Sequence, residues 1–86
     1  MDKESKIRLA RLIDSVIAGR IRAADAIEEM SGWSNGEDFD RAANDAYHQL
    51  IHFRDDEDIR ARDAIYADEQ VKGLERTVQR LRSSAE

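Results

Sequence analysis

The chain of 86 residues contains no cysteine and no proline, and only four of its residues are glycine. The absence of cysteine excludes a disulfide-stabilised scaffold, a thiolate metal site and a cysteine nucleophile. The N-terminal residues alternate in charge and lack the apolar segment of a signal peptide. These features together lead us to expect a cytoplasmic protein.

Long hydrophobic runs are also missing, so the sequence predicts no membrane-spanning segment. It has no glycine-rich phosphate loop, no nucleophile elbow and no basic patch interleaved with aromatic residues, which nucleic-acid-binding proteins use. A chain of this length buries only about 60–65% of its unfolded surface, which leaves little room for a deep pocket. We therefore expect one domain over residues 1–86 that binds through its outer surface, without catalytic residues, cofactor, membrane or nucleic acid.

The apolar residues recur at intervals of three and four, which is typical of amphipathic helices, and alternation at period two is hard to find. The pattern predicts an all-α protein. Its helices are expected over residues 3–18, 23–30, 38–53 and from 64 or 67 to 83. Ala42, Ala43 and Ala46 on one face of the third helix favour the close approach of another helix.

Glycines mark the expected helix ends. Gly19 follows the first helix at a position that favours a left-handed cap, and Gly32 is expected to stop the second helix. The segment 31–37 is rich in turn-forming residues and predicts a loop. Trp33 in this loop is expected either to cover the end of the core or to serve as a partner-binding anchor. Gly73, inside the last helix, costs that helix about 1 kcal/mol relative to alanine.

Charge is unevenly distributed along the chain. Residues 1–24 carry a net charge of +3 and residues 70–86 a net charge of +2, whereas residues 25–69 carry −10. Such a segment repels nucleic acid and anionic membranes and attracts a basic partner. The alternative is that these charges lie on a solvent-exposed face and bind no partner.

Acidic residues are densest between residues 53 and 69, which contain seven carboxylates and three arginines. If this segment is helical, Asp56 is expected to pair with Arg60 and Asp58 with Arg62 at four-residue spacing. Whether it forms a helix or an ordered loop stays open. Three further carboxylates have no obvious local partner: Asp55, Glu57 and Asp63.

Two histidines, His48 and His52, have the four-residue spacing that lets two imidazoles reach one zinc ion. The residues between them lack the glutamate of the metalloprotease pattern. A third ligand would have to come from Asp45, Asp55 or Asp56. We favour the interpretation that the two histidines flank a core face and bind no metal.

Several segments resemble the colicin D immunity family. They are L-A-R-L-I at 9–13, I-A-G-R-I-R-A-A-D-A-I-E-E-M at 17–30, A-Y-H-Q-L-I-H-F-R-D-D-E-D-I-R at 46–60 and L-E-R-T-V-Q-R-L-R at 74–82. The resemblance implies a small antiparallel four-helix bundle that protects a toxin-producing cell. It also implies that an acidic face blocks the basic cleft of a tRNA-cleaving nuclease toxin.

The first hypothesis is therefore an inhibitory binding protein of the immunity type, whose partner is a basic protein such as a nuclease toxin domain. The alternative is a structural helical homodimer without catalytic activity. For the first hypothesis, the expected partner-binding residues are Asp55, Asp56, Glu57, Asp58, Asp63 and Tyr66.

Overall fold

A computed structural model describes residues 3–33 and 41–85, apart from the side chains of Trp33, Ala42 and Ala85. These residues form helices and no strand, which confirms the all-α prediction. The helices are α1 (Lys3–Ile17), α2 (Ala23–Trp33), α3 (Arg41–Asp55), α4 (Glu57–Arg62) and α5 (Ala64–Ala85). No helix within these ranges combines the length and the hydrophobicity that a membrane crossing requires.

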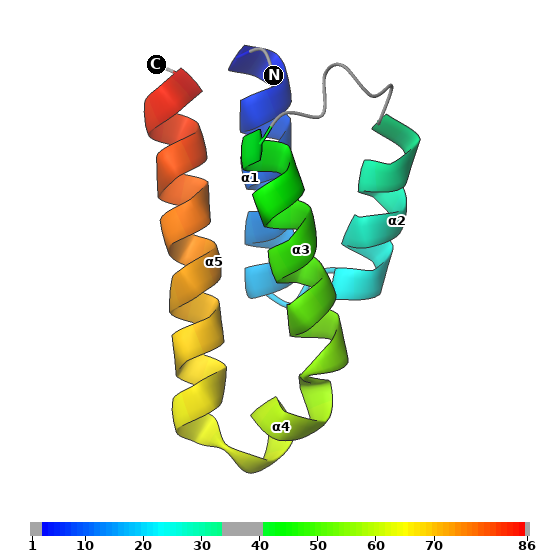
Figure 1. Cartoon of the computed structure of the whole chain (residues 1–86), viewed down its shortest axis with the longest axis vertical. Coiled ribbons are helices and arrows are strands. Elements are labelled where there is room, and N and C mark those ends of the chain that lie inside the picture. Colours follow the sequence, from blue (N-terminus) through cyan, green and yellow to red (C-terminus); the bar gives the residue numbers. More distant parts are fainter. Residues whose placement is uncertain (1–2, 34–40, 86) are drawn as a thin grey trace.

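Four long helices run alternately up and down and form a small antiparallel bundle (Figure 1). Helix α1 packs most extensively against α5, and α2 packs against α3. The short helix α4 lies across the lower end, where the chain turns from α3 into α5 (Figure 1). The acid-rich residues 53–69 therefore lie at the lower end of the bundle, around α4.

Apolar residues from the four long helices form the core, as their three-to-four spacing predicted. The largest completely buried side chains are Leu9, Ile13, Met30 and Leu50. Helix α4 contributes no buried residue. Hydrophobic burial therefore stabilises the long helices but does not hold α4 in place.

Small residues line the contact between α2 and α3. Ala26 on α2 and both Ala43 and Ala46 on α3 have no exposed surface. Side chains of this size let two helix axes approach closely. The expectation for the alanine face is confirmed at 43 and 46, and the side chain of Ala42 lies outside the described residues.

Gly19 ends α1 as the sequence predicts. Its φ is +75°, and its N–H donates to the Val16 carbonyl oxygen at 3.0 Å. The Arg20 N–H donates to the Ser15 carbonyl oxygen at 2.9 Å. These bonds satisfy carbonyl groups that the end of a helix leaves without partners.

The second helix does not stop at Gly32, because α2 continues to Trp33. The predicted loop from 31 was therefore wrong in its first three residues, and residues 34–37 lie outside the described part of the chain. So do the predicted start of the third helix at 38 and the side chain of Trp33. Helix α5 begins at Ala64, the earlier of the two starts that the sequence allowed.

Gly73 provides a stability test within the long helix α5. An added methyl group at Gly73 meets no atom within 4 Å. We expect Gly73→Ala to raise the free energy of unfolding by about 1 kcal/mol, because alanine has the higher helix propensity. Thermal unfolding followed by circular dichroism measures this change as a higher melting temperature.

Gly19→Ala is the matched control. The same methyl group also meets open space at Gly19, but the φ of +75° disfavours any residue with a Cβ. This variant is expected to melt below the native chain. A gain at Gly19, or a loss at Gly73, would contradict the assignment of the two glycines to a cap and a helix interior.

Candidate protein-binding surface at the α4 corner

The six predicted partner-binding residues all lie in residues 55–66, which we call the α4 corner. The structure brings them together because α4 is only six residues long and joins α3 to α5 through single-residue connections. They are Asp55 at the end of α3, Asp56 directly before α4, Glu57 and Asp58 in its first turn, Asp63 after it and Tyr66 in the first turn of α5.

Asp56 is used inside the corner. Its carboxylate accepts hydrogen bonds from the Tyr66 hydroxyl at 2.5 Å and from the Gln70 side-chain amide at 2.9 Å. The hydrogen bond to Asp56 raises the pKa of the Tyr66 phenol, because it favours the protonated form. Asp56 and Tyr66 therefore tie the start of α4 to α5.

Arg60 completes this network from α4. Its guanidinium lies 3.5 Å from the centroid of the Phe53 ring and donates to the Phe53 carbonyl oxygen. The same nitrogen, Nη1, donates to Gln70 Oε1 at 2.9 Å. Gln70 thus contacts both Asp56 and Arg60, and the network joins α3, α4 and α5.

The pairing predicted from four-residue spacing was wrong for both arginines. Asp56 is the N-cap residue of α4, and its carboxylate bonds to Tyr66 and Gln70 instead of Arg60. Arg60 instead stacks on Phe53, where the ring face attracts the cation. Arg62 Nε donates to the backbone carbonyl oxygen of Asp58 at 3.3 Å and not to its carboxylate.

Asp63 caps the last helix. Its Oδ1 accepts the backbone N–H groups of Ile65 and Tyr66, each at 3.1 Å. These are among the donors that the start of a helix leaves without partners, and the negative charge also suits the helix dipole. Asp55 forms an exposed ion pair with its neighbour Arg54, with Arg54 Nε 3.0 Å from Asp55 Oδ1.

Glu57 and Asp58 remain available to a partner. Both residues are exposed, and their carboxylates make no hydrogen bond or ion pair with any other described residue. Their position in the first turn of α4 suits the helix dipole. Of the six predicted residues, these two are the ones whose carboxylates or hydroxyl form no bond within the described part of the chain.

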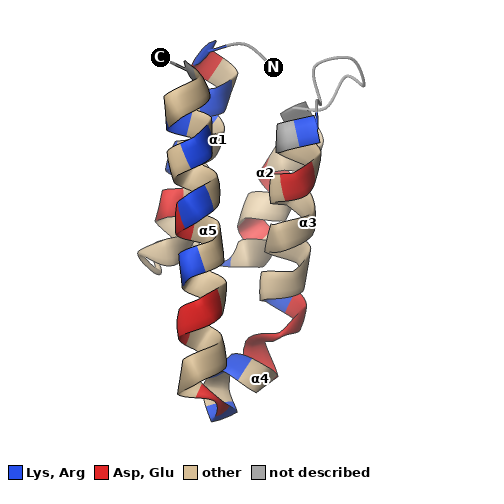
Figure 2. Ribbon diagram, turned by 60° about the vertical axis from the view of Figure 1, so that its left-hand side comes forward, with Lys and Arg blue, Asp and Glu red and all other residues tan. Residues whose placement is uncertain are grey.

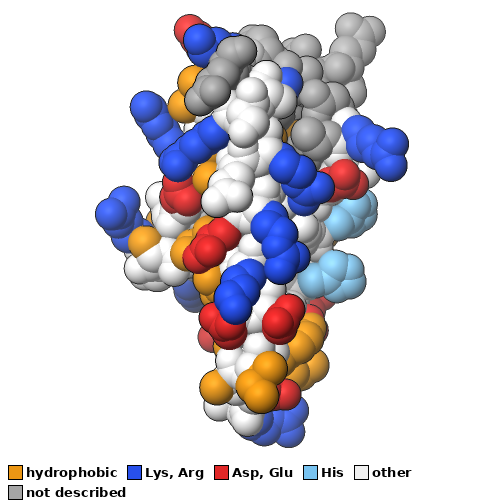
Figure 3. Space-filling view, turned by 90° about the vertical axis from the view of Figure 1, so that its left-hand side faces the viewer, with side chains coloured by type: hydrophobic (Ala, Val, Ile, Leu, Met, Phe, Trp, Pro, Cys, Tyr) orange, Lys and Arg blue, Asp and Glu red, His pale blue; other side chains and the backbone are white. Residues whose placement is uncertain are grey.

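Two isoleucines that the sequence reasoning did not include as contacts accompany these carboxylates. Ile65 is 79% exposed and Ile59 is 41% exposed, and they are the large hydrophobic residues exposed in the described part of the chain. Figure 3 shows hydrophobic side chains at the lower end of the molecule with acidic side chains beside them. The available signal was that neither isoleucine belongs to the apolar stripe of a core-facing helix.

The basic residues lie largely elsewhere. Figure 2 shows Lys and Arg along the upper parts of α1 and α5, and both acidic and basic residues at the lower end around α4. Some of these charges are paired, as Arg82 with Asp14 and Lys72 with Asp68 at 2.8 Å. The charge separation along the sequence is therefore only partly a separation in space, because Arg54, Arg60 and Arg62 lie with the acidic residues at the lower end.

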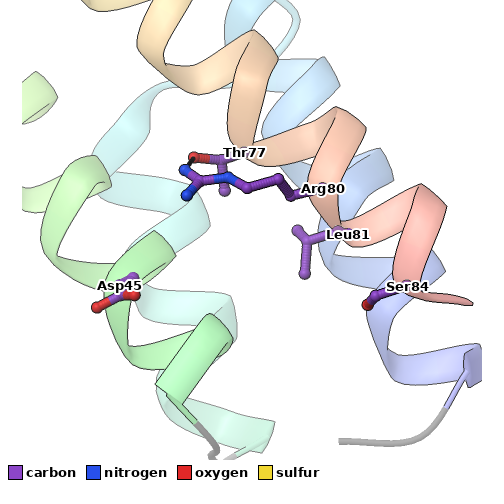
Figure 4. Close-up of a pocket in the computed structure, with 5 residues that line it drawn as sticks. All are labelled: Asp45, Thr77, Arg80, Leu81 and Ser84. Atoms are coloured by element: carbon purple, nitrogen blue, oxygen red, sulfur yellow. Dashed lines mark hydrogen bonds between the residues drawn. The ribbon is translucent and has the colours of Figure 1, made fainter.

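A different hollow, of about 230 Å³, opens between α3 and α5 in the upper half of the bundle. Asp45 lies on the α3 side, whereas Thr77, Arg80, Leu81 and Ser84 lie on α5 (Figure 4). Arg80 Nη2 donates to the Thr77 hydroxyl oxygen at 3.3 Å. Asp45 and Arg80, the charged residues of this lining, thus lie on opposite sides of the hollow.

His48 and His52 are both exposed on α3. Among the residues that the structure describes, no group of three or more His, Cys, Asp or Glu side chains is placed to hold a metal ion. The two histidines therefore lack a third ligand within that part of the chain.

Tyr66→Phe tests the network that holds α4. The variant loses the bond to Asp56, so we expect its melting temperature at pH 8 to be a few degrees lower than that of the native chain. The phenol pKa is higher in the folded chain than its ordinary value of 10.0, so its stabilising effect is complete below pH 10 and is lost as the pH rises through the folded pKa.

Thermal unfolding of both proteins between pH 8 and pH 11 measures the effect. The difference in melting temperature is expected to shrink above pH 10. A difference that stays constant or grows in that range would contradict the role assigned to the Tyr66 hydroxyl.

Comparisons with protein-family models, with curated proteins and with solved structures find no match to this chain.

Proposed function

We propose that this chain is an inhibitory binding protein of the immunity type, and that its α4 corner covers the basic cleft of a tRNA-cleaving nuclease toxin. The observation that carries the proposal is the combination of Glu57 and Asp58, which have no partner among the described residues, with an Ile65 side chain that is 79% exposed. Exposed apolar residues beside charged ones are typical of protein-binding sites.

The geometry divides the six predicted residues into two groups. Asp56, Asp63 and Tyr66 hold the corner together through hydrogen bonds within the chain. Glu57 and Asp58 are assigned to partner contact, with Asp55 at the edge because it is already paired with Arg54. Ile59 and Ile65 join the contact residues.

A rigid corner with free carboxylates is suited to binding a basic nuclease cleft. A nuclease cleft holds phosphates with lysine and arginine, so carboxylates on a preorganised element can take their place. Their charge also raises the rate of encounter and makes that rate sensitive to salt. An isoleucine that leaves water on binding adds affinity that salt does not weaken.

Affinity capture at low salt, from a lysate of the organism that carries the gene, tests this function. The native chain, a corner variant (Glu57→Gln, Asp58→Asn and Ile65→Ser) and a control variant with Glu28→Gln and Asp45→Asn serve as baits. We expect the native and control baits to retain a basic protein with ribonuclease activity, released as salt rises. If the corner variant retains the same proteins as the native bait, the proposal fails.

The exposed isoleucines also favour a second candidate, a homodimer formed through the α4 corner. The two candidates respond to salt in opposite ways. In a homodimer the corner carboxylates of two copies face each other, so salt screens their repulsion and strengthens association. Sedimentation at high micromolar concentration supports the homodimer if the mass doubles as salt rises, and excludes it if the chain stays monomeric throughout.

A further inference from the structure

A pocket of about 250 Å³ lies between the turn from α1 to α2 and the region where α3 meets α4. In Figure 1 this turn lies beside the lower part of α3. The apolar lining residues of the pocket, which we call the apolar floor, are Val16, Ile21, Ala23, Ala24 and Phe53. The charged lining residues are Arg22, Arg54, Arg60 and Glu57.

The three arginines are oriented by contacts within the chain. Arg22 Nε lies 3.4 Å from Asp25 Oδ2, and Arg54 Nε lies 3.0 Å from Asp55 Oδ1. Neither Asp25 nor Asp55 lines the pocket. These carboxylates hold the guanidinium groups from outside the pocket.

Each guanidinium retains hydrogen-bonding capacity. A guanidinium has five N–H donors, and the bonds within the described residues use only Nε of Arg22 and Arg54 and only Nη1 of Arg60. The Arg22 backbone N–H also donates to Asp25, and this bond lowers the pKa of the Asp25 carboxyl. Asp25 thus pairs with an Arg22 side chain that is 85% exposed and open to a ligand.

We propose that this pocket binds a small organic carboxylate carried on an apolar body, such as an aromatic or medium-chain acid. The apolar floor accepts the body, and the guanidinium groups at the edge accept the carboxylate through charge-assisted hydrogen bonds. The pocket shares Glu57 and Arg60 with the α4 corner, but this proposal does not require the partner proposed there.

The lining selects this class of ligand over others. Asp25 and Asp55 pair with two of the three arginines from outside the lining, so net charge does not select the ligand. The preference for an anion comes from the guanidinium N–H donors that the bonds within the described residues leave free. A bare inorganic anion leaves the apolar floor uncovered, whereas the planar fork of arginine matches a carboxylate. The volume corresponds to roughly eight water molecules at liquid density, which suits a single ring or a short chain.

Titration of the ¹⁵N-labelled chain with benzoate, followed by NMR, tests the site. We expect saturable shifts of the Nε–H signals of Arg22 and Arg54 and of the Ala24 amide, with a Kd on the order of 1 mM. Benzyl alcohol, benzylammonium and acetate are the matched comparators, and each is expected to bind at least about tenfold more weakly. Absence of saturable shifts with benzoate, or equal shifts with acetate, would overturn the inference.

Single substitutions locate the site. Arg54→Gln and Arg22→Gln are each expected to weaken benzoate binding about five- to tenfold. Glu57→Gln is expected to strengthen it about twofold or more, because it removes the one acidic group among the described lining residues. Arg76→Gln, on α5 and outside this pocket, removes the same charge and is expected to leave the affinity unchanged.

A pocket-filling variant separates a true site from general attraction of anions. Ala24→Leu changes no charge but occupies part of the pocket, so it is expected to abolish benzoate binding. Melting temperatures within a few degrees of the native chain establish that each variant is folded. If Ala24→Leu binds benzoate as the native chain does, or if Arg76→Gln weakens binding as much as Arg54→Gln, the pocket is not the site.

Discussion

A chain that carries Glu57→Gln, Asp58→Asn and Ile65→Ser is expected to bind its basic partner at least about 100-fold more weakly than the native chain. The three residues are exposed, so their replacement removes contact with a partner without removing a contact of the core. A buried apolar anchor in a protein interface contributes about 2 kcal/mol or more, and the two carboxylates add electrostatic attraction. Isothermal titration calorimetry at low salt measures the loss.

The control for this variant removes two charges far from the corner. Glu28→Gln with Asp45→Asn changes the net charge of the chain by the same amount, on α2 and α3. We expect this control to bind within about threefold of the native chain. Equal losses in both variants would mean that net charge, and not the α4 corner, determines binding.

The carboxylates of the α4 corner are expected to affect the association rate, and Ile65 the dissociation rate. The amide substitutions at 57 and 58 slow association and reduce its dependence on salt, because exposed charges steer the encounter. The loss of Ile65 speeds dissociation, because an apolar contact acts after the encounter. Surface plasmon resonance at several salt concentrations separates the two effects. A salt-independent association rate for the native chain would contradict the role of the carboxylates.

Leu50→Ala is expected to lower the free energy of unfolding by about 3 kcal/mol. Leu50 is completely buried on α3, so truncation removes burial and leaves a cavity. Domains of this size have a total stability of only about 4–13 kcal/mol, so the loss is a large fraction of it. Denaturation with urea, followed by circular dichroism, measures the change.

Ile65→Ala is the matched control for this measurement. It also shortens a large aliphatic side chain, but one that is 79% exposed, so the change is expected to stay within about 0.5 kcal/mol. The pair therefore separates an apolar residue that stabilises the fold from one that is available to a partner. Comparable losses from both substitutions would show that Ile65 is part of the core.

Much of the fold follows from local patterns in the sequence. The first helix ends within one residue of its predicted end because an apolar stripe and a cap at Gly19 coincide. The second helix extends past its predicted end at Met30, because Gly32 is compatible with helical geometry and lowers helix propensity without preventing a helix. Helix propensity alone does not determine where α2 ends.

The roles of the acidic residues were harder to predict. The sequence locates the α4 corner but does not show which carboxylates are used within the chain. Asp56 bonds to Tyr66 and Gln70, which lie ten and fourteen residues later, so the contact depends on how α5 folds back. Asp63 is different, because an aspartate directly before a helix is a local capping signal that could have been recognised.

The importance of Ile65 also depends on the tertiary structure. Ile65 lies outside the apolar stripe of its helix, which is a sequence signal that it is not in the core, but an exposed fraction of 79% follows only from the folded chain. Arg60 illustrates the same limit, since its contact with Phe53 arises where α3 turns into α4. Local spacing predicted an ion pair there instead.

The most direct test of the central claim is the cleavage of tRNA by a basic nuclease, if affinity capture recovers one with the chain. Cleavage is measured at low salt while the native chain or the corner variant is added. We predict that activity falls to zero at about one native chain per nuclease, and that the corner variant requires at least about 100-fold more. Full cleavage in the presence of saturating native chain, or equal inhibition by the corner variant, would contradict the account.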